Sequence, residues 1–386
     1  MLKIKKQDFL FYIAYFLLYI SFFLGDLNIV YDDFNLQKII RIVSYVLLLI
    51  SLIDLKLSKR ELKFLFLILL LLSAYSYVFK DLYWNIICLL IYRAKYCDVK
   101  TIFKISLFAN IISICIVLTL CYLGVLPDIV TYRDSFNTYS NPRHSLGFVH
   151  SNVLPLLILY CFIYYIIINE NRTKLKFDLF FLLCSIIIYV TNNSRNAFLL
   201  TCILFISTVT LRKITLKDKY KEMIYSLTRY SVVFLSLFSY CMTFLLLRGG
   251  IWDKIDNVFS GRFRLAIFKI RSLGGIKLLN LMNNNDFSND NIMYVTGDFM
   301  HNIIIDNGYL YVIIRYGLLI LIFYYMVCFR LSKYYRNKPI LLITIMMVFV
   351  SNFIDNDLVD YSFLPFILLA FNYKNIIELR LEEKLI

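Results

Sequence analysis

Residues 186–200 read IIIYVTNNSRNAFLL, so a short polar break that contains Arg195 separates two apolar runs. A charge at the centre of a membrane helix costs about 3 kcal/mol on insertion scales, and such a residue usually has a partner or a function. Backbone that faces lipid does not tolerate a break of this kind, because its peptide groups would lose their hydrogen bonds. The stretch therefore predicts two membrane helices that meet at a polar site containing Arg195.

The composition places the chain among integral membrane proteins. Of its 386 residues, 60% are hydrophobic, and the mean hydropathy is +0.71, whereas soluble domains are close to one half apolar. A net charge of +15 would suggest nucleic acid in a soluble protein. In a membrane protein, Lys and Arg instead mark the cytoplasmic connections, so we expect no nucleic-acid partner.

The apolar runs predict an all-α polytopic membrane protein in which residues 1–386 form a single integral membrane domain. A membrane helix needs about 20 mostly apolar residues, with about 17 as the lower end. About twelve runs approach this length, namely 9–25, 38–55, 62–79, 80–96, 102–124, 149–168, 179–193, 195–211, 226–247, 308–329, 339–354 and 360–373.

Basic residues fall in every second connection between these runs, and residues 212–221 alone hold five lysines and arginines. The positive-inside rule then places these connections and both termini in the cytoplasm. The loop 125–148 and the long segment 248–307, which precedes the tenth span, would be extracytoplasmic. Connections as long as 248–307 are usually functional or disordered.

The first outward loop carries three candidate substrate-binding residues. Arg143, His150 and Asn152 lie in this loop or at the mouth of the sixth span. A histidine in such a position usually caps a helix or contacts the interface, but the neighbouring arginine and asparagine favour a binding site.

A predicted helix in the long segment presents basic residues on two sides. Arg262 and Lys269 are seven residues apart and share a face if Ser260 caps the helix, whereas Arg264 and Arg271 share nearly the opposite face. One pair can therefore point into a site. Because a guanidinium binds phosphate oxygens through two parallel hydrogen bonds, Arg262 is a candidate contact to an anionic substrate.

Two residues before the tenth span are candidate catalytic bases, namely His301 and Asp306. The sequence Asp355-Asn356-Asp357 resembles the Asp-x-Asp signature of metal-dependent sugar transferases. It lies between two spans with no nucleotide-binding fold nearby, so we interpret it as a solvated acidic turn. We expect neither a metal nor another cofactor, and the nine cysteines contain no Cys-x-x-Cys pair.

Taken in order, these motifs resemble the polytopic polymerases of bacterial O-antigen and capsular polysaccharide (the Wzy type), which are related to the O-antigen ligases. The span number and the late outward segment also match, so the resemblance covers nearly the whole chain. Ligases carry a His-Asn pair before a glycine of the following span. Here Asp306-Asn307 takes that place and His301-Asn302 precedes it, which leaves the base open and favours a polymerase. The resemblance lies in Arg143…Gly147-Phe148-Val149-His150-Ser151-Asn152, Asn193-Ser194-Arg195, Gly261-Arg262 and Asp306-Asn307-Gly308-Tyr309…Tyr316-Gly317.

The resemblance implies an enzyme of the bacterial cytoplasmic membrane that joins oligosaccharide repeat units outside it. The donor would be a glycan on undecaprenyl pyrophosphate, and the acceptor a second lipid-linked unit. Arg143, His150, Asn152, Arg195 and Arg262 would bind pyrophosphate or glycan, with His301 or Asp306 as the base. Besides these glycans and membrane lipids, the implied partners are a chain-length regulator and a flippase of the same pathway.

Three other functions compete with this interpretation. An O-antigen ligase-like transferase would use the same donor. A lipid-linked oligosaccharide flippase would predict two similar halves and a midplane site, but no internal repeat is evident. A membrane acyltransferase would require an acyl-donor route, which the sequence does not reveal.

Overall fold

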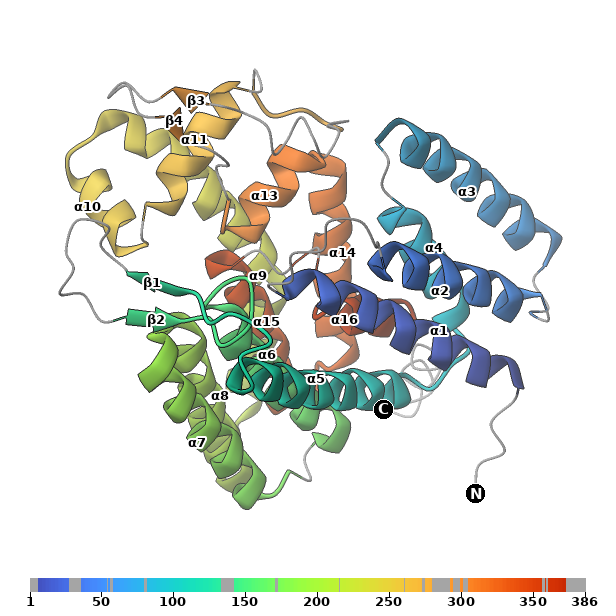
Figure 1. Cartoon of the computed structure of the whole chain (residues 1–386), viewed down its shortest axis with the longest axis horizontal. Coiled ribbons are helices and arrows are strands. Elements are labelled where there is room, and N and C mark those ends of the chain that lie inside the picture. Colours follow the sequence, from blue (N-terminus) through green and yellow to red (C-terminus); the bar gives the residue numbers. More distant parts are fainter. Residues whose placement is uncertain are drawn as a thin grey trace.

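A computed structural model of the chain describes residues 6–27, 36–53, 55, 58–79, 82–132, 142–170, 173–214, 216–259, 261–272, 275–279, 292–293, 299–300, 305–355, 358 and 360–372. Most of them are helical (Figure 1). Within this part of the chain, five helices are long and apolar enough to cross a membrane: Asp8–Asp26, Val99–Tyr122, Leu175–Asn192, Arg195–Lys213 and Asp218–Arg248. The predicted all-α membrane protein class is thus supported, whereas the number of twelve spans stays a prediction.

The first part of the chain forms four helices on one side of the molecule, coloured blue to cyan in Figure 1. Helix α1 packs against α2 and against the later α5, while α3 contacts α4 at the periphery. Large apolar side chains of α3 are exposed, Phe66 at 69% and Leu71 at 60% among them. Exposed apolar surface of this kind suits lipid contact. The bounds are α1 Lys6–Phe23, the short 3-10 helix η1 Leu24–Asp26, α2 Leu36–Leu52, α3 Lys59–Phe79 and α4 Tyr83–Ala94.

The remaining helices form a bundle around α6, α15 and α16, which are almost entirely buried. These three sequences are apolar on all sides, which is typical of helices surrounded by protein or lipid. Helices α5, α7, α8, α9 and α14 pack around them. The bounds are α5 Val99–Tyr122, α6 Val153–Asn169, α7 Leu175–Asn192, α8 Arg195–Lys213, α9 Asp218–Leu245, α13 Gly308–Arg315, α14 Leu318–Tyr334, α15 Pro339–Ile354 and α16 Leu364–Phe371.

Short connections make successive helices antiparallel, so the bundle has two distinct ends. Helix α5 has 24 residues, which separates its ends by about 36 Å at 1.5 Å per residue. At one end, α6 and α8 begin and α7 and α15 end; we call it the Arg143 end. At the other, the Glu170 end, α6 and α14 end and α5 and α15 begin.

A strand pair and the described part of the long segment lie at the Arg143 end. An antiparallel hairpin joins β1, Val130–Tyr132, to β2, Pro142–His144, with Thr131 opposite Arg143. The long segment contributes the 3-10 helix η3 (Leu246–Arg248), α10 (Ile251–Val258), α11 (Arg262–Ser272) and the strand pair β3 (Ile292–Met293) and β4 (Phe299–Met300).

Three predicted spans differ from the observed helices. The apolar run 308–329 is two helices, α13 and α14, because the chain breaks at Gly317, whose φ of 91° favours glycine. Helix α4 has 12 residues and α16 has 8, so they are shorter than the runs 80–96 and 360–373. The run 339–354, by contrast, coincides with α15.

Candidate functional site

The polar break predicted from residues 186–200 forms one corner of the site. Asn193 ends α7 with a left-handed φ of 48°, which asparagine adopts more readily than most residues. The fully buried amide of Asn192 donates to the carbonyl oxygens of His144 at 2.7 Å and Ser151 at 3.1 Å. The end of α7 is therefore fixed to the hairpin and to the start of α6.

Arg143 is held in this corner by two partners. Its Nε donates to the backbone oxygen of Asn192 at 3.2 Å, and one terminal nitrogen donates to Oδ1 of Asn152 at 2.5 Å. Beside it, the carboxylate of Asp128 accepts from Nδ1 of His144 at 2.6 Å and from the backbone nitrogen of Leu146 at 2.8 Å. These contacts fix the hairpin, so Arg143 and Asn152 lie together in one polar corner.

Helix α11 brings Arg262 to the same end from the long segment. The Asp256 carboxylate accepts from the backbone nitrogen of Phe263 at 3.0 Å, and the Phe263 side chain is buried, which fixes the start of the helix. Arg262 and Lys269 are 11% and 1% exposed, whereas Arg264 is 47% exposed. The predicted division of α11 into an inward and an outward basic face is confirmed, although Ser260 lies outside the described residues.

Two carboxylates from different elements meet at Arg262. Its Nε lies 3.6 Å from Oδ2 of Asp306, and Nη2 lies 3.5 Å from Oδ1 of Asp355. The third nitrogen, Nη1, is buried and has no hydrogen-bond partner among the described residues. A buried donor without a partner costs about 1–3 kcal/mol, so this nitrogen favours an additional acceptor at the site.

Asp355 corrects one sequence prediction. The residue is 8% exposed, so the interpretation of Asp355-Asn356-Asp357 as a solvated turn is wrong at its first position; Asn356 and Asp357 lie outside the described residues. Asn152 donates to Oδ1 of Asp355 at 3.4 Å, which joins the Arg143 corner to Arg262.

Burial raises the pKa of Asp355 to about 6, against the opposing effect of Arg262. The available sequence signal was a carboxylate directly after an apolar run, at the end where arginines gather.

Asp306 is positioned by its neighbour Asn307, which sequence reasoning did not select. The Asn307 side chain accepts from the backbone nitrogen of Leu310 and caps α13. Its amide donates to Oγ of Ser239 at 3.0 Å and to the backbone oxygen of Phe353 at 2.8 Å. Helix α13 therefore starts against the end of α15, which places Asp306 and Asp355 around the same guanidinium.

The other predicted site residues are distributed differently. His150 lies beside the cluster, where partial burial of its ring and the charge of Arg143 lower its pKa. Arg195 starts α8 at the same end, but it is exposed and no described contact joins it to Arg143 or Arg262. His301 lies outside the described residues.

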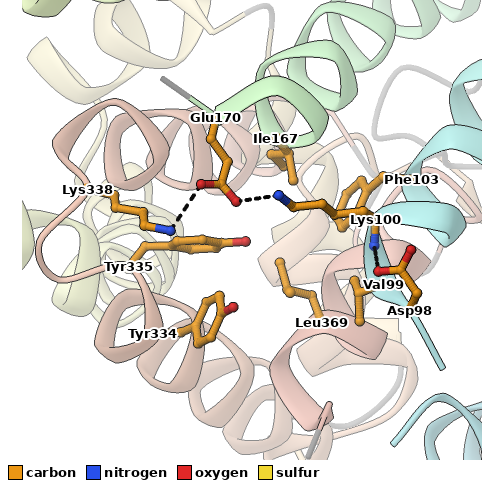
Figure 2. Close-up of a pocket in the computed structure, with 10 residues that line it drawn as sticks. All are labelled: Asp98, Val99, Lys100, Phe103, Ile167, Glu170, Tyr334, Tyr335, Lys338 and Leu369. Atoms are coloured by element: carbon orange, nitrogen blue, oxygen red, sulfur yellow. Dashed lines mark hydrogen bonds and ion pairs between the residues drawn. The ribbon is translucent and has the colours of Figure 1, made fainter. Parts of the chain in front are cut away.

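A separate cavity of about 220 Å³ opens at the Glu170 end (Figure 2). The Glu170 carboxylate lies between Lys100 at 2.9 Å and Lys338 at 3.1 Å, and Tyr335 forms part of the wall. These ion pairs lower the pKa of Glu170 although its partial burial raises it. The pairs join α5, α6 and α15 at the end of the bundle opposite Arg143.

In the part of the chain that the structure describes, no three His, Cys, Asp or Glu side chains are grouped to hold a metal ion. Comparison with protein-family models, with curated proteins and with solved structures finds no match to this chain. The fold and site thus define a mostly helical membrane protein in which partly buried arginines meet carboxylates at one end of the bundle.

Proposed function

We propose that the chain is a polysaccharide polymerase, which joins undecaprenyl-pyrophosphate-linked oligosaccharide repeat units on the extracytoplasmic side of the bacterial cytoplasmic membrane. The observation that carries the proposal is the buried Nη1 of Arg262, which has no partner among the described residues, beside Arg143 at the end of a bundle of apolar helices. A membrane-borne pyrophosphate would supply the oxygen acceptor that this nitrogen lacks.

Binding of the donor explains why the site contains arginines. Each guanidinium offers five N–H donors in a planar fork that matches phosphate oxygens. In the structure, Arg262 is shared between Asp306 and Asp355, and its contacts at 3.5 and 3.6 Å leave room for a stronger acceptor. The exposed Arg195 at the start of α8 is proposed as a further contact at the rim.

The proposed glycosyl transfer needs positive charge beside the leaving pyrophosphate and one base near the acceptor hydroxyl. When the acceptor hydroxyl attacks the anomeric carbon, negative charge develops on the departing pyrophosphate, and preorganised arginines stabilise it. The leaving group is already activated, so the proposed reaction requires neither a nucleotide nor a metal. His301 and Asp306 are the sequence candidates for the base.

The test measures chain length after reconstitution of the purified protein with lipid-linked repeat units, with and without EDTA. Arg262→Ala and Arg143→Ala should each lower the rate roughly tenfold to a hundredfold, because a charge-assisted hydrogen bond contributes about 1.5–3 kcal/mol. The Arg262→Lys variant should retain more activity than Arg262→Ala but less than the wild type, since an ammonium lacks the planar fork of a guanidinium. The matched control is Arg264→Ala on the exposed face of α11, where Arg264 pairs with Asp253 at 2.7 Å.

Normal polymer from well-folded Arg262→Ala and Arg143→Ala proteins would reject the site. If the variants accumulate single repeat units on lipid, the polymerase is supported. In cells that contain the rest of the pathway, variants that leave full-length chains on the lipid would instead indicate the ligase-like alternative.

A further inference from the structure

The carboxylate of Asp355 is fixed through one oxygen and open at the other. Oδ1 accepts from Asn152 at 3.4 Å and lies 3.5 Å from Arg262, whereas no hydrogen bond or ion pair joins Oδ2 to the described residues. The side chain is 11% exposed, so it is reachable without being surrounded by water. We propose that Asp355 is the catalytic base that removes the proton from the acceptor hydroxyl, an inference that rests on the proposed function.

The neighbouring titratable groups are less suited to this role. Asp306 is 43% exposed and contacts Arg262 through Oδ2, so water competes for its remaining acceptor positions. Nδ1 of His150 accepts from the backbone nitrogen of Asn152 at 3.1 Å, so in the neutral ring the proton sits on Nε2. That nitrogen donates rather than accepts, and it suits a phosphate or glycan oxygen.

The charges that face Asp355 come from several elements. Arg262 approaches from α11, Asp306 from the start of α13 and Arg143 from β2; His150 lies beside the same two arginines and Asp306. Burial is the main cause that raises the pKa of Asp355 to about 6, and the two arginines oppose it. A base of this strength is ionised in most molecules near neutral pH and still accepts a proton readily.

The step balances as a simple displacement. The hydroxyl proton moves to Oδ2 of Asp355 while the hydroxyl oxygen bonds to the anomeric carbon of the donor. The bond between that carbon and the pyrophosphate oxygen breaks, and its electron pair leaves with the polyprenyl pyrophosphate beside Arg262 and Arg143. Asp355 then releases the proton to water before the next cycle.

The experiment separates catalysis from donor binding in the reconstituted protein. Asp355→Asn should lower the polymerisation rate by about 10²–10⁴-fold, the usual contribution of a general base. Its affinity for undecaprenyl pyrophosphate should be unchanged or higher, because Arg262 loses a competing negative charge. Asp253→Asn, on the exposed side of α10, is the control and should retain wild-type rate. Asp355→Glu keeps a carboxylate and should retain partial activity. This variant tests the proposal even if Asp355→Asn folds poorly.

The pH profile provides a second, independent readout. The wild-type rate should rise with pH through a midpoint near 6 as Asp355 loses its proton, and Asp306→Asn should keep this limb. A folded Asp355→Asn protein that polymerises at a rate close to wild type, or a pH limb lost in Asp306→Asn, would overturn the role of Asp355. If the wild-type protein itself extends no lipid-linked unit, the proposed function fails instead.

Discussion

At the scale of single residues, Asn192 connects the predicted polar break to the site. Its amide donates to His144 and Ser151 from a fully buried position. Asn192→Ala should leave both carbonyl oxygens unpaired and destabilise the protein by about 1–3 kcal/mol. Thermal unfolding in detergent measures this effect, with Asn196→Ala on α8 as the control. Equal melting temperatures for the two variants would show that Asn192 does not hold this corner.

The sequence predicts some site residues better than others. Arg143 and Asn152 are predicted because they cluster with His150 at the mouth of a span. Arg262 is predicted because a guanidinium on one face of a helix can bind phosphate oxygens. Asp355 was missed because its burial depends on α11 and on the start of α6, which no local pattern reveals. Its sequence neighbours are equally consistent with an exposed turn. Its role in a polar cluster became visible only when the elements were assembled.

At the scale of elements, α13 touches the end of α15 at Gly308. A Cβ atom there would lie 2.9 Å from the backbone oxygen of Asn352 and 3.2 Å from that of Asp355. Gly308→Ala should therefore push the helices apart and destabilise the protein by about 1–3 kcal/mol. It should also slow polymerisation, because Asp306 and Asp355 lose their common position at Arg262.

Gly25→Ala is the matched control for this substitution. There the nearest atom is Nε2 of Gln37 at 2.8 Å, the end of a flexible side chain that can move away. If Gly308→Ala unfolds at the same temperature as wild type, the close approach of α13 and α15 is not required.

Helix positions were largely predictable, whereas the break between α13 and α14 was not. Apart from Arg315, the residues around Gly317 are mostly apolar on both sides, so hydropathy joins them into one run. Only the backbone conformation, with φ at 91°, separates them. The number of membrane crossings therefore cannot be counted from apolar runs alone in this chain.

At the scale of the whole molecule, the basic connections predict which end of the bundle faces the cytoplasm. The Glu170 end should be cytoplasmic and the Arg143 end extracytoplasmic, because Lys and Arg gather in the connections at the former. Single cysteines at Val125 and Lys219, both exposed, test this in a background without the nine native cysteines. A membrane-impermeant thiol reagent should label Val125→Cys in intact cells and leave Lys219→Cys unlabelled. The reverse pattern would place the site on the wrong side for the proposed reaction.

Helices α6 and α15 are fastened to each other at both ends. Asn152, just before α6, contacts Asp355 at the end of α15, and Glu170 after α6 contacts Lys338 before α15. Neither helix can slide along the other without breaking one of these contacts, so the pair acts as a strut between the two ends of the bundle. Helix α11 is joined to it by the longer Arg262 ion pairs. For the proposed reaction, we therefore expect α11 rather than the strut to shift when lipid-linked sugars bind at Arg262.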